Sequence, residues 1–180
     1  MEQWFFKTTE YAEELLKGLD KLEDWPETTK KIQSNWIGKS NGSEIRFMDA
    51  YGKFDISVFT TRPDTINGVS YIVVAPESDL VTQITKEEYR EDVRKYIEQT
   101  GRLTEIERLS SEREKTGVFT GAYVVNPING EKIPVWIADY VLDDYGTGAV
   151  MAVPAHDKRD YEFAKKYKLT IKEVILGNES

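Results

Sequence analysis

Apolar residues near the amino terminus recur at a helical spacing. The members of this pattern are Tyr11, Leu15, Leu19 and Leu22. Thr9 precedes them with a side chain of the type that caps helices, and Pro26 opens a second stretch at a point where a first helical turn tolerates proline. The turn-forming residues 40–43 then end the helical pattern. We therefore predict a helical appendage over residues 1–36 and a main domain over residues 37–180.

Beyond this turn, apolar and polar residues alternate with the period of a β-strand or form short apolar runs bounded by turns. The predicted strands are 44–47, 54–60, 69–75, 123–125, 132–138, 149–153 and 169–176. The first two form a hairpin, and Asn129-Gly130 provides the positive φ that the turn of a second hairpin needs. The run 69–75 is apolar almost throughout, which is typical of a strand buried on both faces.

Parts of the main domain have a helical pattern instead. Thr85 and Glu88 are spaced as a capping box ahead of a helix that Gly101 ends. A charge-rich helical stretch follows around Ile106, and Asp157 is placed to cap a last helix. The mixed charges on these helices indicate solvated faces. The fold class is therefore α/β, mostly strands with helices inserted between them.

The composition excludes several kinds of chemistry. The 180 residues contain no cysteine and one histidine, His156, so a disulfide, a thiol nucleophile or a zinc site with two histidines is impossible. The 24 basic and 32 acidic residues give a net charge of −8, which argues against a strongly basic nucleic-acid module but leaves room for a local RNA site. No apolar run approaches the ~20 residues that span a membrane, and we expect a cytoplasmic protein.

Polar residues crowd at the ends of two predicted core strands. One segment is Thr60-Thr61-Arg62-Pro63-Asp64-Thr65, where proline stiffens a loop that carries hydroxyls, a guanidinium and a carboxylate. The other runs from Gly146 to Asp160, and in it a glycine turn leads into a strand and then into a helix start bearing two acids. Taken singly, each feature has an ordinary interpretation: strand threonines, a surface ion pair, helix-capping acids and a turn histidine.

Taken together, the two segments resemble the editing insertion of leucyl-tRNA synthetase, also called connective polypeptide 1. The matching residues are the run 60–65, Ala75-Pro76-Glu77, Tyr145-Gly-Thr-Gly-Ala-Val-Met-Ala-Val-Pro-Ala-His-Asp, 160–164, 35–38 and 116–121. The bacterial type is the closer match, and residues 1–34 resemble the segment of the synthetase body that leads into the insertion. The resemblance implies a β-rich, barrel-like core with peripheral helices.

The resemblance also implies an activity, which is hydrolysis of the ester between a wrong amino acid and the 3′-terminal adenosine of leucine tRNA. Norvaline, isoleucine and methionine esters are the expected substrates, and leucine is expected to be spared. The remainder of the synthetase would be a partner in the full-length protein, and we expect a monomer with no membrane, metal or cofactor involved. One histidine is too few for the ATP-binding signature of the family, so no aminoacylation is expected from this chain.

The family positions give each candidate residue an expected role. Thr60, Thr61 and Asp160 would be catalytic: the threonines bind the oxyanion or the attacking water, and Asp160 receives the substrate α-ammonium, kept ionised by the helix dipole. Thr65 would exclude leucine by steric collision. The other expected substrate-binding residues are Arg62, Asp64, Tyr145, Met151, Val153, His156 and Asp157. Thr65 and Asp160 must then reach one aminoacyl group.

Three other interpretations stay open at this point. An RNA-docking module without activity, a free-standing trans-editing deacylase and a valyl-type editing domain all share parts of the pattern. The valyl type typically has glutamate at the position of Asp64 and a different run after the glycine turn. Asn67 departs from the leucyl pattern, because a bulky apolar or aromatic residue is usual there.

Overall fold

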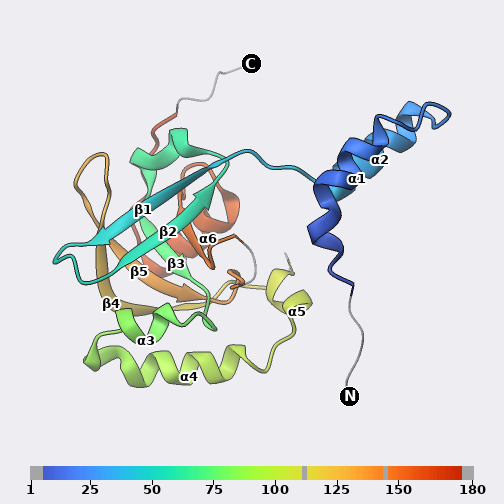
Figure 1. Ribbon diagram of the computed structural model, residues 1–180. Coiled ribbons are helices and arrows are strands. Elements are labelled where there is room, and N and C mark those ends of the chain that lie inside the picture. Colours follow the sequence, from blue (N-terminus) through green and yellow to red (C-terminus); the bar gives the residue numbers. More distant parts are fainter. Residues whose placement is uncertain (1–5, 111–112, 144–145, 176–180) are drawn as a thin grey trace. The chain divides into compact units, whose positions relative to one another are not determined.

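The computed structural model describes residues 6–110, 113–143 and 146–175 (Figure 1). The chain divides into two compact units, residues 1–41 and residues 42–180. The division falls inside the turn-forming segment 40–43, where the helical pattern of the sequence ends.

The first unit is helical. It contains η1 (Thr8–Tyr11), α1 (Ala12–Leu19) and α2 (Glu27–Ile37). The predicted cap at Thr9 is wrong, because Thr9 lies inside the 3-10 turn and α1 begins after Tyr11 without a side-chain cap. Pro26 is the residue before α2, so its missing N–H costs the helix no hydrogen bond. None of the described residues of these helices is buried.

Six strands form one sheet in the second unit (Figure 1). They are β1 (Ser43–Asp49), β2 (Asp55–Thr60), β3 (Tyr71–Val74), β4 (Gly117–Val125), β5 (Lys132–Ala138) and β6 (Ala149–Ala152). Their order is β2-β1-β4-β5-β3-β6, and all neighbours are antiparallel except β3 and β5. The pairs β1–β2 and β4–β5 confirm the two predicted hairpins.

The sheet is open rather than closed into a barrel. The two edge strands, β2 and β6, approach each other. Within the described ranges, however, no backbone ladder joins them. β6 ends at Ala152, and Pro154 follows with no N–H to extend a ladder. The predicted α/β class with a β-rich core is confirmed, with the difference that the ring of strands stays incomplete.

Helices and turns connect the strands. They are η2 (Pro63–Gly68), α3 (Leu80–Ile84), η3 (Glu87–Tyr89), α4 (Arg90–Thr100), α5 (Glu105–Leu109) and α6 (Lys158–Tyr167). The capping box predicted at Thr85 is wrong, since the Thr85 hydroxyl donates back to the Val81 carbonyl at 2.6 Å and ends α3. A capping box forms instead at Thr104, whose partner is Glu107. The predicted strand 169–176 is also wrong for its described part, since residues 169–175 form no strand.

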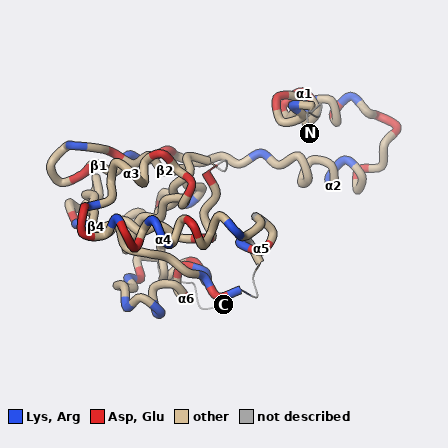
Figure 2. The backbone as a smooth tube through the Cα atoms, turned by 90° about the horizontal axis from the view of Figure 1, so that it is seen from below, with Lys and Arg blue, Asp and Glu red and all other residues tan. Residues whose placement is uncertain are grey.

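Two apolar clusters cover the two faces of the central strands. Ile72 and Val74 face a cluster that includes residues of α3 and α4, while Tyr71 and Val73 face a second cluster that includes Phe163 of α6. Alternate side chains of β3 therefore enter different cores, which explains the continuous apolar run in its sequence. Basic and acidic residues both occur along α4 (Figure 2), and its charged residues are exposed.

Candidate aminoacyl site

The register of two strands brings the polar segments of the sequence together. β3 pairs with β6 in antiparallel register, with Tyr71 opposite Ala152. The Ser70 amide extends the ladder by donating to the Ala152 carbonyl at 3.0 Å. The turn η2, which precedes β3, therefore lies at the same end of the sheet as the segment 153–160, which follows β6. The glycine turn 146–148 lies at the other end of β6, where the Ala75 amide donates to the Gly148 carbonyl at 2.9 Å.

Thr65 is the buried residue of the first segment. It is 1% exposed, and its hydroxyl donates to the Arg62 carbonyl at 2.8 Å. Its amide donates to the same carbonyl at 3.1 Å. Both donors of Thr65 are therefore used within the turn, so the side chain offers a neighbour its methyl group and the acceptor side of its hydroxyl.

The other polar residues of this loop are more exposed. Arg62 and Asp64 form a two-bond ion pair, with Nε to Oδ1 at 3.1 Å and Nη2 to Oδ2 at 3.0 Å. This guanidinium, through its hydrogen bonds, lowers the pKa of the Asp64 carboxyl. The Thr60 hydroxyl accepts a bond from the Arg62 amide at 3.0 Å, and Thr61 lies exposed beside it.

A buried asparagine holds this loop in place. It was not a candidate from the sequence. Asn126, 1% exposed, follows β4 and donates from Nδ2 to the Ile66 carbonyl at 2.9 Å. Its Oδ1 accepts the Ile128 amide at 2.9 Å. The turn between β4 and β5 is thereby tied to η2. The only signal in the sequence was a polar residue directly after an apolar strand.

Asp160 is the buried residue of the second segment. It lies in the first turn of α6 and is 3% exposed. Its amide donates to Oδ1 of Asp157, the N-cap residue, at 2.9 Å, which confirms the predicted cap. Its own Oδ2 accepts the Val153 amide at 2.9 Å. Among the described residues, no hydrogen-bond donor reaches its Oδ1.

The electrostatic environment of Asp160 differs from the one that the sequence predicted. Burial, followed by the negative charge of Asp157, raises the pKa of Asp160 to about 7. The expectation that the helix dipole dominates is therefore wrong. Arg159 offsets the shift only weakly, because its Nε lies 3.8 Å from Asp160 Oδ1, beyond hydrogen-bonding distance. That Nε is itself buried and without a hydrogen-bond partner in the described ranges.

Two tyrosines form the surroundings of this carboxylate, and neither was a candidate from the sequence. The Tyr71 hydroxyl donates to the Asp160 carbonyl at 3.2 Å and lies 3.3 Å from the Tyr140 hydroxyl. The Arg159 guanidinium lies over the Tyr140 ring, 4.7 Å from its centre. Burial raises the pKa of both phenols.

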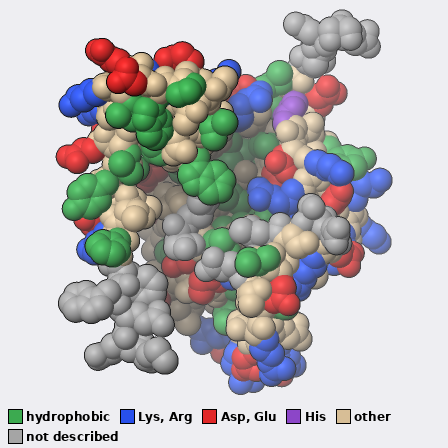
Figure 3. All heavy atoms as spheres, turned by 90° about the vertical axis from the view of Figure 1, so that its right-hand side faces the viewer, with side chains coloured by type: hydrophobic (Ala, Val, Ile, Leu, Met, Phe, Trp, Pro, Cys, Tyr) green, Lys and Arg blue, Asp and Glu red, His purple; other side chains and the backbone are tan. Residues whose placement is uncertain are grey.

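The remaining candidates occupy three different environments. Met151 is 7% exposed and belongs to the larger apolar cluster, against which Val153 packs in part. His156 accepts the Val174 amide at Nε2, 3.3 Å away, and is the purple side chain visible at the surface in Figure 3. Tyr145 lies outside the described residues.

The parts of the chain that the structure describes contain neither a metal-binding cluster nor a membrane-spanning helix. No group of three or more His, Asp or Glu residues there is arranged to hold a metal ion. No helix there combines the length and the apolar character that crossing a bilayer requires.

Comparison with known proteins identifies the family. The family model described as "Leucyl-tRNA synthetase, editing domain" matches residues 34–180. The chain belongs to the leucyl-tRNA synthetase editing-domain family. This result decides against the valyl-type alternative. Residues 60–65 and 146–160, which carried the resemblance in the sequence, both lie inside the matched region of this editing domain.

The relatives of this editing domain are longer proteins. It is 59% identical over all 180 residues to the leucine–tRNA ligase of Clostridium kluyveri, of which it covers 22%, and 57% identical over 175 residues to that of Borrelia hermsii, of which it covers 21%. A solved LeuRS–tRNA–LeuAMS ternary complex of Agrobacterium radiobacter K84 matches with a TM-score of 0.79 and 41% identity, over 96% of this chain and 21% of that one. The chain thus spans about a fifth of these relatives.

Proposed function

We propose that this editing domain hydrolyses the ester that joins a wrong amino acid to the 3′-terminal adenosine of leucine tRNA, and that it spares the leucine ester. The observation that carries the proposal is the free Oδ1 of Asp160, a buried carboxylate oxygen without a hydrogen-bond donor in the described ranges. The domain would act as part of a leucine–tRNA ligase, which would bring the tRNA 3′ end to it.

Asp160 is suited to receive the α-ammonium of an aminoacyl ester. A buried carboxylate with an open oxygen is unfavourable until a cation or donor completes it. An ammonium group would supply the missing hydrogen bond, and a positive charge in addition to that of Arg159, whose Nε lies 3.8 Å from Oδ1. The raised pKa of Asp160 fits this role, because ammonium binding would favour the ionised form that burial disfavours.

Thr65 is suited to act as the steric filter. Its hydroxyl is already bonded to the Arg62 carbonyl, so a substrate side chain would meet its methyl group. We infer that the branched γ-carbon of leucine collides there, while norvaline, isoleucine or methionine is accepted. Met151 and Val153, at the end of β6, would form apolar lining for the accepted side chain. A second selection is needed because a pocket distinguishes one methylene by only ~1–3 kcal/mol.

Water is the proposed nucleophile. Its oxygen attacks the ester carbonyl carbon, the bond between that carbon and the ribose oxygen breaks, and the ribose oxygen takes a proton that originates from the water. Thr60 and Thr61 would bind the developing oxyanion or the water, and the ester is reactive enough for positioning to suffice. Arg62 would contact the phosphate or ribose of the terminal nucleotide, oriented by Asp64.

The other predicted binding residues would act around this centre. Asp157 stabilises the first turn of α6 by accepting a hydrogen bond from the Asp160 amide. His156, directly before Asp157, accepts a hydrogen bond from the Val174 amide and so links this segment to residue 174. Tyr145 would contact the adenosine. The proposal involves no metal and no cofactor.

The test is a deacylation assay with leucine tRNA charged with norvaline, isoleucine, methionine or leucine. The first three should lose their amino acid, and the leucine ester should persist. Asp160→Asn should remove the activity, and Asp92→Asn, an exposed acid on α4, is the matched control that should keep it. Binding of the tRNA without release of any amino acid would instead identify a docking module.

A further inference from the structure

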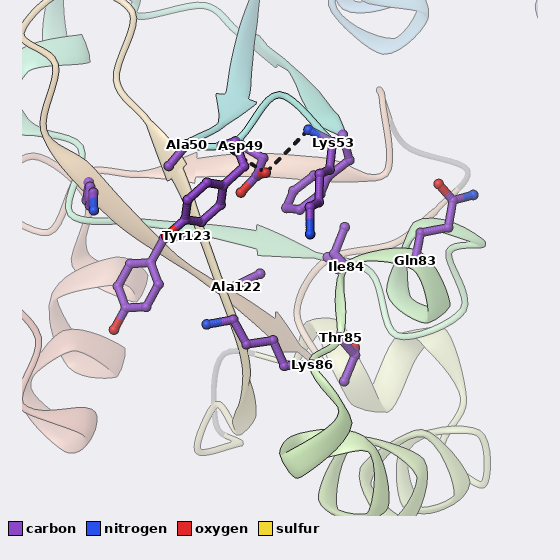
Figure 4. A pocket seen from close by; sticks show the side chains of 12 residues that line it. Asp49, Ala50, Lys53, Gln83, Ile84, Thr85, Lys86, Ala122 and Tyr123 are labelled. Carbon is purple, nitrogen blue, oxygen red and sulfur yellow. Dashed lines mark hydrogen bonds between the residues drawn. The ribbon is translucent and has the colours of Figure 1, made fainter.

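A cavity lies away from the proposed aminoacyl site. It has a volume of about 520 Å³ and is formed by the β1–β2 turn, the end of α3, strand β4 and the first residue of β5. Figure 4 shows the labelled lining residues of the turn on one side, with those of α3 and β4 on the other. A cavity of this size is within the ~300–1,000 Å³ of small-ligand sites.

The cavity is separate from the proposed editing centre. None of the predicted site residues lines it. It lies at the β1–β2 turn, where Met48 pairs with Asp55, whereas Thr60 is at the far end of the same strand pair. The length of β2 between Asp55 and Thr60 is about 17 Å at ~3.3 Å per residue.

Three lysines give the cavity a positive charge. Lys53, Lys86 and Lys132 all line it, and within the described ranges none of their ammonium groups has an ion pair or hydrogen bond. Asp49 is the one acid in the lining. Its Oδ2 accepts hydrogen bonds from the backbone amides of Tyr51 at 3.1 Å and Lys53 at 3.3 Å, and these bonds stabilise the β1–β2 turn.

Three acids close to the cavity in sequence have other partners: Glu87 pairs with Arg90, and the other two are Asp55 and Glu131. Glu88, two residues after Lys86, has no ion pair within the described ranges. Asp55 forms two hydrogen bonds to Arg46, at 2.6 and 2.9 Å. Glu131, next to Lys132, is paired with Lys172. The lining therefore carries three positive charges and one negative charge, that of Asp49, in a chain whose net charge is −8.

Exposed aromatic rings line the same cavity. Tyr51 is 81% exposed and Tyr123 is 41% exposed, and both are lining residues. Large exposed rings beside lysines are the combination that single-stranded nucleic acids use, since bases stack on the rings and phosphates pair with the ammonium groups. An acidic peptide would use the lysines but would gain little from the two rings.

We propose that this cavity is a binding site for a single-stranded RNA segment, with phosphates at Lys53, Lys86 and Lys132 and a base on Tyr51 or Tyr123. This inference rests on the proposed function, in which the substrate is an RNA, but the cavity lies outside the centre where the ester reacts. It would hold the RNA strand at a second point and so lower the substrate concentration needed for editing.

The test measures binding of a 5′-labelled unstructured 12-nucleotide RNA to the whole chain by fluorescence anisotropy, at several salt concentrations. The pocket variant combines Lys53→Gln, Lys86→Gln and Lys132→Gln. The control variant removes the same charge elsewhere through Lys21→Gln, Lys31→Gln and Lys165→Gln. Circular dichroism establishes that both variants are folded.

The pocket variant should raise the Kd at least tenfold at low salt and reduce the slope of log K against log salt by roughly 2, because each lysine contact to a single strand contributes ~0.7. The control variant should change the Kd less than threefold. Tyr51→Ala combined with Tyr123→Ala should weaken binding at least fivefold, from lost stacking.

Three results would overturn the proposal: no RNA binding by the unmodified chain, equal losses in the pocket and control variants, or binding of poly-glutamate as tight as that of RNA. None of these depends on ester hydrolysis. An inactive domain that still binds RNA through the lysines would refute the proposed function and leave this inference standing.

Discussion

Two arginine–aspartate pairs of the candidate site have the same chemistry and opposite environments. Arg62 and Asp64 have side chains 61% and 51% exposed and make two hydrogen bonds. Asp160 is 3% exposed, and its Oδ1 lies 3.8 Å from Arg159 without a hydrogen bond. The satisfied pair is at the surface, where ion pairs stabilise little, and the unsatisfied one is buried, where an open oxygen is costly. The contrast supports the proposal that Asp160 binds a ligand.

The largest effect is expected from Asp160→Asn. If the buried carboxylate binds the ammonium, kcat/KM for every misacylated tRNA should fall by about 10²–10⁴-fold, which corresponds to the ~3–5 kcal/mol lost when one partner of a buried charge pair is removed. The losses should be equal for norvaline, isoleucine and methionine esters, because the ammonium is common to all. A variant with the unmodified rate would show that Asp160 is only a first-turn acid.

Thr65→Ala should have a smaller and opposite effect, a gain of activity. Without the threonine methyl group, the leucine ester should be hydrolysed about 5–150-fold faster, the range that ~1–3 kcal/mol of apolar discrimination allows. Thr65→Phe should block all substrates. Parallel measurement of leucine and norvaline esters checks both variants. If Thr65→Ala still spares leucine, selection lies at another residue, and Met151 and Asn67 are the next to substitute.

Asp160→Asn should also change the pH dependence of stability. The folded pKa of about 7 lies above the ordinary value of an aspartate, so between about pH 4 and 7 the folded protein retains a proton that the unfolded chain has lost. The unmodified protein therefore loses stability as the pH rises through this window. The variant lacks that loss and should be more stable at pH 8 by on the order of 1–3 kcal/mol. Urea unfolding at pH 4.5 and pH 8 measures the difference.

The smallest effect is expected at the exposed pair. Asp64→Asn should leave the melting temperature nearly unchanged, because exposed ion pairs are screened by water. Any difference should shrink further in 0.5 M salt. Thermal unfolding at low and high salt provides the measurement. A destabilisation as large as that of a core substitution would mean that the two pairs differ less than their burial suggests.

Much of this fold follows from local sequence patterns. The alternation in 44–47 and 54–60 predicted β1 and β2, and the turn Asn129-Gly130 predicted the β4–β5 hairpin. Asp157 was predicted as a helix cap because capping depends on residues three positions apart. The capping box at Thr85 failed because that hydroxyl bonds back into α3, a competing local bond with the same residue types.

The site was only partly predictable. The family resemblance indicated Thr65 and Asp160, but Asn126 and Tyr71 act on chain segments that are distant in sequence, and no local pattern reveals such partners. The upward shift of the Asp160 pKa was missed for the same reason. Burial, which raises this pKa, depends on residues from other elements, whereas the sequence suggested only the dipole of its own helix. The open sheet was not predictable either, because it depends on the absence of a backbone ladder between β2 and β6 in the described ranges.

The long separation of these partners has a consequence for when the site forms. The Ile66–Asn126 and Tyr71–Asp160 hydrogen bonds join residues 60 and 89 positions apart. Closing such long loops costs more entropy than forming a hairpin, so contacts of this kind tend to appear late on a folding pathway. The β1–β2 hairpin requires no such closure and can form early. A partly folded domain would thus be inert rather than promiscuous, and would not strip leucine from correctly charged tRNA.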